Sequence, residues 1–364
     1  MNDRILTRLS AGLLGILLSL YPWGQARSEV PELVTERYEF ELGGQRLVGL
    51  LDRPTRPMAT VIIVHGYGET RVLEQNAWFA LRSFFAGLGL NVLLWDKPGC
   101  GESDGEFDIN QSVASSAEEV LAAARSLRRR AIPGSEVIGL WGISRAGWIA
   151  PLAMQADPDL AFWISVSGTD DRENARYLLE QNWRIEGRSE EEIGMLLDEW
   201  QQGFDTVWQG GSYRDYLAAT RRLREDPFMQ FMGWAEAVSE AGFLAYQSKF
   251  EDGTFLVDRD SGLQVYVPKF RAVLSSIDRP VLALFGEKDT NVDWRSTASL
   301  YHETLGENPA AELTIISFPD ADHNLHIAET GGIREMQSRA DSRYAPGFAQ
   351  AMGDWLIARG FGRR

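Results

Sequence analysis

The stretch at residues 137–152 constrains this chain most, because it predicts a strand, a tight turn and a helix with a serine at the turn. An apolar run of strand length ends at Gly142, Ser144 follows two residues later, and an apolar helical pattern begins directly after it. The small residues Ala146 and Gly147 allow a sharp turn, and the new helix directs free N–H groups toward the serine. We therefore expect Ser144 to act as a nucleophile; the alternative is a serine that merely caps the helix.

The segments around this turn alternate between strand and helix patterns. Apolar or β-branched runs, typical of strands buried on both faces, occupy residues 60–64, 91–95 and 161–166, and helical patterns occupy residues 76–87 and 112–130. A hairpin with a glycine turn precedes them at residues 37–52. This alternation predicts an α/β fold with a doubly wound, mostly parallel sheet.

The alternation stops after the third of these strand runs. Residues 172–275 are largely helical in pattern, charged and rich in tryptophan and phenylalanine. Strand patterns then resume at residues 280–285 and 312–318, with helical patterns at residues 294–304 and 346–359. We therefore predict an α/β core made of residues 27–171 and 276–364, into which residues 172–275 are inserted as a helical cap.

Residues 1–26 have the composition of a secretory signal peptide. Arg4 and Arg8 precede a short apolar run at residues 9–21, and small residues lead up to Ala26. We expect cleavage near Ala26 and export of the mature chain to the periplasm or the medium. The alternative is an uncleaved membrane anchor, although the apolar run is short for a membrane span.

The chain is acidic, with a formal net charge of −16, and its one cysteine is Cys100. This charge argues against a nucleic-acid partner and against electrostatic binding to anionic membranes. A single cysteine cannot form an intrachain disulfide, so the exported fold must be stable without one. The sequence leaves the oligomeric state open.

A nucleophilic serine requires a base that takes its proton and a carboxylate that orients the base. His323 follows the strand pattern at residues 312–318, and functional groups in open α/β sheets collect at the carboxyl ends of strands, where Ser144 also lies. His323 is therefore the expected base, with His326 as the reserve candidate.

The expected carboxylate is Asp289, which comes just after the strand pattern at residues 280–285. Asp293 and Asp170 are weaker candidates, the latter because it also follows a strand. The alternative for Asp289 is a helix cap, a common role of an acid in a loop between a strand and a helix.

Several motifs resemble those of the α/β-hydrolase family, over about residues 37–171 and 276–360. The serine turn is similar to the family's G-x-S-x-G elbow with alanine in the fifth position, and the order Ser144, Asp289, His323 is the order that the family shows. Residues 65–68 resemble the family's H-G-x-G loop, and residues 96–103 its D-x-x-G-x-G-x-S loop.

The resemblance implies an oxyanion hole made of two backbone N–H groups, those of Tyr67 and Arg145. It also implies that His65 braces its loop and that Cys100 is structural. No metal or cofactor is required.

These features together predict an exported serine hydrolase that cleaves a carboxylic ester of a small molecule. The aromatic residues of the predicted cap favour apolar acyl or aromatic leaving groups; alternatively they form only the cap's own core. A peptidase or amidase of the same fold, an acyltransferase and a catalytically silent ligand-binding protein remain open. The sequence does not fix the acyl-chain length or the leaving group.

Overall fold

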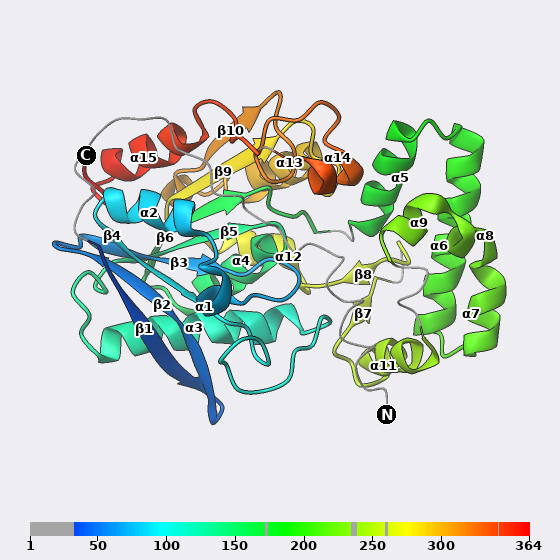
Figure 1. Cartoon of the computed structure of the whole chain (residues 1–364), viewed down its shortest axis with the longest axis horizontal. Coiled ribbons are helices and arrows are strands. Elements are labelled where there is room, and N and C mark those ends of the chain that lie inside the picture. Colours follow the sequence, from blue (N-terminus) through cyan, green and yellow to red (C-terminus); the bar gives the residue numbers. More distant parts are fainter. Residues whose placement is uncertain (1–32, 172–173, 234–238, 259–260, 341) are drawn as a thin grey trace. The chain divides into compact units, whose positions relative to one another are not determined.

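The computed structural model of the chain describes residues 33–171, 174–233, 239–258, 261–340 and 342–364. The predicted signal peptide at residues 1–26 lies outside the described residues. The chain divides into two compact units (Figure 1). An α/β unit runs to Asp171 and resumes at Lys269, and a helical unit covers Arg172–Pro268.

Within the described residues of the α/β unit, eight strands form one sheet in the order β1-β2-β4-β3-β5-β6-β9-β10. They are β1 (Leu33–Leu42), β2 (Gln45–Pro54), β3 (Ala59–Val64), β4 (Leu90–Trp95), β5 (Ile138–Ile143), β6 (Leu160–Val166), β9 (Val281–Gly286) and β10 (Thr314–Phe318). The pairs β1–β2 and β2–β4 are antiparallel, and the other neighbouring pairs are parallel. This confirms the predicted α/β fold with a mostly parallel sheet.

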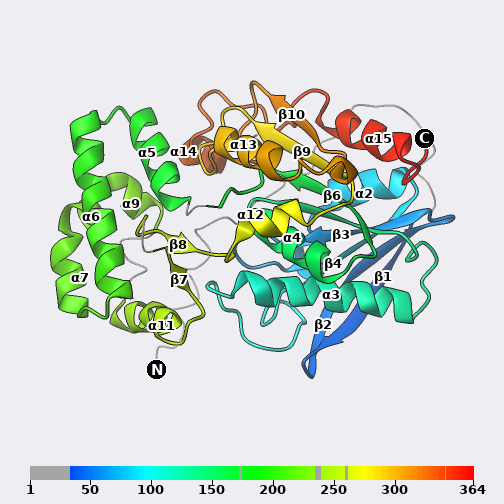
Figure 2. The same cartoon turned by 180° about the vertical axis from the view of Figure 1, so that it is seen from behind.

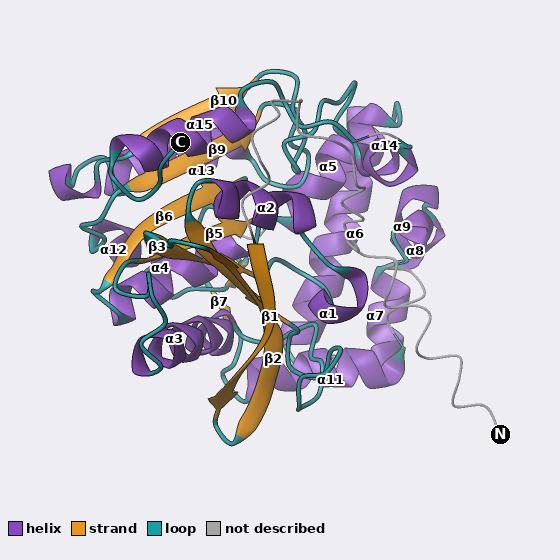
Figure 3. Ribbon diagram, turned by 60° about the vertical axis from the view of Figure 1, so that its left-hand side comes forward, coloured by secondary structure: helices purple, strands orange, loops and turns teal. Residues whose placement is uncertain are grey.

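Helices cover both faces of this sheet (Figures 2 and 3). On one face lie α2 (Phe79–Gly87) and α15 (Phe348–Ala358), and on the other lie α3 (Val113–Arg129), α4 (Ala146–Ala156), α12 (Phe270–Ser275) and α13 (Trp294–Thr304). Three shorter elements lie in the connections: α1 (Val72–Gln75), the 3-10 helix η2 (Pro309–Ala311) and α14 (Ile333–Ser338). Although α12 falls within the stretch 172–275 that the sequence assigned to the cap, it belongs to the α/β unit.

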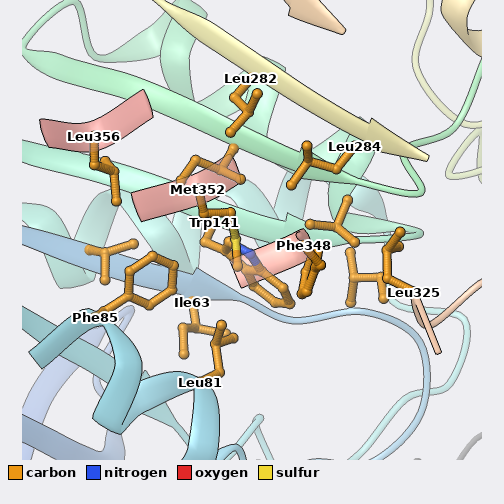
Figure 4. Packing of buried hydrophobic residues seen from close by; sticks show 14 of the residues in the cluster. Ile63, Leu81, Phe85, Trp141, Leu282, Leu284, Leu325, Phe348, Met352 and Leu356 are labelled. Atoms are coloured by element: carbon orange, nitrogen blue, oxygen red, sulfur yellow. The ribbon is translucent and has the colours of Figure 1, made fainter. Parts of the chain in front are cut away.

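A hydrophobic cluster fills the space between the sheet and the helices α2 and α15 (Figure 4). Ile63 of β3 and Trp141 of β5 belong to this cluster together with Phe85 of α2 and Met352 of α15. Ile62, on the opposite side of β3, is equally buried, as the continuous apolar pattern predicts. Burial of each such side chain contributes about 1.5–3 kcal/mol, so the cluster holds the central strands and their carboxyl-end loops in place.

Two predicted helices begin later than their patterns indicate. The helix expected from residue 76 begins at Phe79, because Asn76 and Trp78 have φ angles of 47° and 62°. The helix expected from residue 346 begins at Phe348, because Gly347 has a φ of 86°. Left-handed backbone cannot continue into a right-handed helix, and apolar spacing alone does not reveal it.

The helical unit contains α5 (Ala175–Ile185), α6 (Glu190–Trp208), α7 (Tyr213–Ala219), α8 (Arg221–Glu225), α9 (Pro227–Phe231) and α11 (Glu240–Glu251), with the short pair β7 (Leu256–Val257) and β8 (Gln264–Val265). Ser189 begins α6 with a capping box. Aromatic side chains of this unit pack on one another: Phe243 contacts the rings of Tyr213 and Tyr216, with centroids 5.7 and 5.4 Å away. Much of its aromatic content thus serves its own core.

In the part of the chain that the structure describes, no helix is both long enough and apolar enough to cross a membrane.

Candidate active site

The turn after β5 holds Ser144 in a conformation that few side chains adopt. Its φ is 57°, in the left-handed region, which costs a non-glycine residue about 1–3 kcal/mol. The Ser144 N–H donates to the Val166 carbonyl at 3.0 Å, and the Ser144 carbonyl accepts from the Gly147 N–H at 2.7 Å. These bonds fix the strained turn between two buried elements and leave the Ser144 residue partly exposed.

Close packing explains why alanine and glycine follow this serine. A side chain at Gly142 would bring its Cβ within 2.5 Å of the Ala146 Cβ. A Cβ at Gly147 would lie 2.6 Å from the Thr169 nitrogen, in the loop after β6. The position that must be glycine is therefore 147, where α4 passes this loop, whereas position 146 accommodates a methyl group.

His323 and Asp289 form a buried pair at the ends of β10 and β9. The His323 Nδ1 lies 2.8 Å from the Asp289 Oδ2, and both side chains are inaccessible to solvent. The other carboxylate oxygen, Oδ1, accepts from the N–H groups of Asn291 and Val292 at 2.8 and 3.0 Å. Since a carboxylate only accepts, Nδ1 carries the shared proton and the lone pair of a neutral His323 is on Nε2.

The His323 Nε2 has no hydrogen-bond partner among the described residues. No described donor, the Ser144 hydroxyl included, therefore occupies this nitrogen. Catalytic hydrogen bonds are often long or absent before substrate binds and tighten in the complex. The arrangement supports a base that is ready to accept a proton.

Opposing effects act on the pKa of His323. Burial lowers it, but the negative charge of Asp289, the hydrogen bond to Asp289 and the charge of Asp322 together outweigh burial, so the pKa is raised above its usual value. A raised pKa means that His323 accepts a proton more readily than an isolated imidazole does.

The loop that carries His323 is anchored by Asp322. Its Oδ1 accepts from the N–H groups of Asn324 and His326 at 2.9 and 3.0 Å, and its Oδ2 pairs with Arg339 at 2.8 Å. A Cβ at Gly286 would lie 2.2 Å from the Asp322 carbonyl oxygen, so the glycine of the G-x-x-D segment is required by the close approach of this loop. The loops after β9 and β10, which carry Asp289 and His323, thus pack closely against each other.

The reserve candidates have other partners. The His326 ring packs on Tyr344 with centroids 4.6 Å apart, and burial lowers its pKa. Asp293 accepts from the N–H groups of Arg295 and Ser296 at 3.1 and 3.2 Å and thereby caps α13. Asp170 follows β6, and its carbonyl accepts from Trp148 Nε1 at 2.7 Å. None of these contacts involves His323.

The two residues expected to supply the oxyanion hole are neighbours. Tyr67 lies in the loop after β3, and the Arg145 guanidinium carbon is 6.0 Å from the centre of its ring. A Cβ at Gly66 would lie 3.5 Å from the carbonyl oxygen of Ile143, the residue before Ser144. The loop that contains Tyr67 therefore lies against the serine turn.

His65 has a bracing role in this loop. Its Nε2 is 2.6 Å from the Trp95 carbonyl oxygen, and its ring packs edge-on against the Trp95 ring at 4.6 Å. Because burial, and secondarily the charge of Lys97, lower the pKa of His65 to about 3, the ring is neutral and Nε2 donates this hydrogen bond. It is not placed as a second base.

The D-x-x-G-x-G-x-S segment folds around Asp96. Its Oδ2 accepts from the Glu102 N–H at 3.0 Å, and its carbonyl accepts from the Ser103 hydroxyl at 2.6 Å. A Cβ at Gly101 would lie 2.0 Å from that carboxylate. Cys100 is buried, which raises the pKa of its thiol and keeps it protonated, so it is a poor nucleophile.

A buried polar network beside this site was missed by the sequence analysis. Glu119 of α3 accepts from Trp95 Nε1 at 2.9 Å and from Gln111 Nε2 at 2.7 Å. The Arg145 side chain donates to the Gln111 carbonyl and Lys97 donates to the loop after β3. No local pattern signals these contacts, because they join residues distant in the sequence.

In the described part of the chain, no group of acidic, histidine and cysteine side chains is arranged to hold a metal ion.

Comparison with solved structures supports the fold. An esterase from Pyrococcus furiosus is 15% identical, with 91% of this chain and 92% of that chain covered and a TM-score of 0.53. A proline iminopeptidase from Mycobacterium smegmatis is 15% identical, with 89% and 99% covered and a TM-score of 0.51. DcsB, solved with its substrate analogue, is 14% identical, with 90% and 100% covered and a TM-score of 0.51.

No curated protein matches this sequence. The family model described as "Alpha/beta hydrolase family" matches residues 61–332, a span that contains the serine turn, the buried acid–base pair and the loop after β3. The chain therefore belongs to the α/β-hydrolase family.

Proposed function

We propose that the protein is a serine hydrolase that cleaves a carboxylic ester through an acyl-enzyme on Ser144. The observation that carries this proposal is the buried His323–Asp289 pair, whose 2.8 Å hydrogen bond places the basic lone pair on an Nε2 atom with no other partner among the described residues. Most buried polar atoms in folded proteins have a hydrogen-bond partner, so a buried Nε2 without one among the described residues supports a nitrogen kept for the reaction.

Each step of the reaction has a residue to perform it. The Ser144 oxygen attacks the acyl carbon while His323 Nε2 accepts the serine proton. The N–H groups of Arg145 and Tyr67 stabilise the negative charge on the acyl oxygen. His323 then protonates the leaving alcohol, and water, activated by the same nitrogen, releases the acid from Ser144.

The Arg145 N–H has a stable position for this role. Arg145 directly precedes α4, where main-chain N–H groups point out of the helix end. The Arg145 guanidinium is bound elsewhere, because it donates to the Ser116 hydroxyl at 3.0 Å and to the Gln111 carbonyl at 2.5 Å. The helix end adds a favourable field for the developing oxyanion.

An ester is favoured over a peptide substrate. A peptidase would require a carboxylate that holds a peptide's amino terminus, for which Glu69, Glu74 and Asp170 are candidates. Glu69 and Glu74 already lie near Arg71, at 3.1 and 3.5 Å, and Asp170 is buried. The proline iminopeptidase with the same fold nevertheless makes an amidase the second candidate to be tested.

The first experiment is labelling of the purified protein with a fluorophosphonate probe, followed by peptide mapping. We expect label on Ser144, none in Ser144→Ala, and a sharp decrease in His323→Ala. A panel of chromogenic esters and aminoacyl amides then separates the two candidates. Folded protein without label at Ser144 would contradict the proposal and favour a silent binding protein.

We also propose that the enzyme acts outside the cytoplasm, on the basis of the signal-peptide pattern at residues 1–26. Fractionation of expressing cells and N-terminal sequencing of the mature chain test this. A mature chain that starts near residue 27 is expected, and an uncut chain in the cytosol would contradict it.

A further inference from the structure

Lys97 makes two hydrogen bonds to the loop that contains Tyr67. Its ammonium donates to the Gly66 carbonyl at 2.7 Å and to the Gly68 carbonyl at 2.6 Å. The two carbonyls belong to the residues on either side of Tyr67, and Lys97 itself is buried, with 7% of its surface exposed. One buried amino group thus holds the carbonyl before Tyr67 and the carbonyl after it.

These bonds fix the direction of the Tyr67 N–H. The Gly66 carbonyl and the Tyr67 N–H belong to the same peptide unit, and in a trans peptide the two groups point in opposite directions. No cis peptide occurs among the described residues. An ammonium on the carbonyl side therefore sets the plane of this peptide and directs the N–H to the side away from Lys97.

We infer that Lys97 is a positioning residue for the oxyanion hole, which holds and polarises the Gly66–Tyr67 peptide so that its N–H is directed at the developing negative charge. The inference rests on the proposed function of Ser144. A hydrogen bond to a charged donor strengthens the donor at the other end of the same peptide. The lysine acts through the backbone and does not touch the substrate.

The surroundings of Lys97 disfavour its charged form. Burial, followed by the nearby Arg145, lowers the pKa of Lys97 to about 7, while Glu119 and Cys100 raise it. Placing an ammonium in such a site costs free energy, which its hydrogen bonds to the Gly66 and Gly68 carbonyls offset in part. The Glu119 carboxylate accepts from Trp95 and Gln111, so it is no dedicated ion-pair partner of the lysine.

The test compares Lys97→Met and Lys97→Gln with the parent enzyme. Loss of a single oxyanion donor typically lowers kcat by about 10²–10³. In Lys97→Met the Tyr67 N–H is still present, but its peptide is no longer held by the lysine. We therefore expect kcat on an ester to fall about tenfold or more, with KM within about twofold of the parent's. Lys97→Gln keeps an N–H donor without the charge and should lose less.

End-point labelling with the fluorophosphonate probe counts the competent Ser144 sites, so each kcat is expressed per labelled site. A positioning role predicts an unchanged end point and a slower rate of labelling. When the Ser144 oxygen attacks the phosphorus and fluoride leaves, negative charge develops on the phosphoryl oxygen, which the same N–H groups stabilise. The matched control is Asn91→Leu at the other end of β4. Asn91 is also buried and donates to a loop carbonyl, that of Pro133, at 2.7 Å; this variant should lose stability and keep kcat per labelled site.

The outcomes separate the inference from the proposed function. If the parent hydrolyses esters and Lys97→Met keeps its kcat per labelled site, the inference is wrong and the proposed function stands. If the activity and the labelled fraction of Lys97→Met fall in proportion, Lys97 is merely structural, which also overturns the inference. If the parent is not labelled at Ser144, both are overturned.

Discussion

Replacement of Asp289 by asparagine should abolish most of the activity, for a reason that the geometry specifies. The Oδ1 atom accepts from two backbone N–H groups, those of Asn291 and Val292, at 2.8 and 3.0 Å. In Asp289→Asn only the amide oxygen can accept from them, so the amide NH₂ must take the place of Oδ2, opposite His323 Nδ1.

This orientation reverses the tautomer of His323. An NH₂ group donates, so Nδ1 must accept and the proton moves to Nε2, the atom that should take the serine proton. In other triads the same change lowers kcat by about 10⁴. We expect a loss of similar size here, with a KM close to that of the parent, since the variant removes a proton acceptor and not a substrate contact.

The assay is steady-state ester hydrolysis, with the folded state checked by thermal unfolding. The matched control is Asp293→Asn in the same loop. Asp293 caps α13 through Oδ1 alone, and its Oδ2 accepts from the Ser296 hydroxyl, which can instead accept from an asparagine NH₂. The control should keep activity within about twofold. Asp289→Asn with more than a tenth of the parent's kcat would refute the assignment of Asp289 as the orienting acid.

Three further predictions follow from particular contacts. Because the pKa of His323 is raised and catalysis needs the neutral ring, kcat/KM should rise with pH through a value above about 6.5; a rate flat from about pH 5 to 8 would exclude His323 as the base. Gly147→Ala should lower stability by about 1–3 kcal/mol in thermal unfolding, whereas Gly353→Ala in α15, whose nearest neighbour is 3.7 Å away, should not. Cys100→Ala should keep full activity, and loss of labelling in that variant would argue for a thiol nucleophile.

Much of the α/β unit was predictable because its signals are local. Buried parallel strands are continuous apolar runs, and β3 and β5 lie within a residue or two of their predicted bounds. The predicted placement of Ser144, Asp289 and His323 rests on the same runs, since each residue follows a strand. The positive φ angles at Asn76 and Trp78 were not predictable, because neither residue type requires that conformation.

The D-x-x-G-x-G-x-S motif could be found from the sequence, but the contacts of Lys97, one of its residues, could not. The motif specifies its aspartate, glycines and serine because these residues stabilise the conformation of their own loop. Asp96, for example, accepts hydrogen bonds from Glu102 and Ser103 of the same segment. Lys97 occupies a variable position of that motif and bonds to the loop after β3, some thirty positions away. Strands β3 and β4 are neighbours in the sheet, so their carboxyl-end loops must meet, but which side chain crosses from one to the other depends on rotamers. A lysine that binds the backbone proposed for the oxyanion hole is therefore recognised only from the structure. If the inference holds, its removal lowers kcat more than it lowers stability.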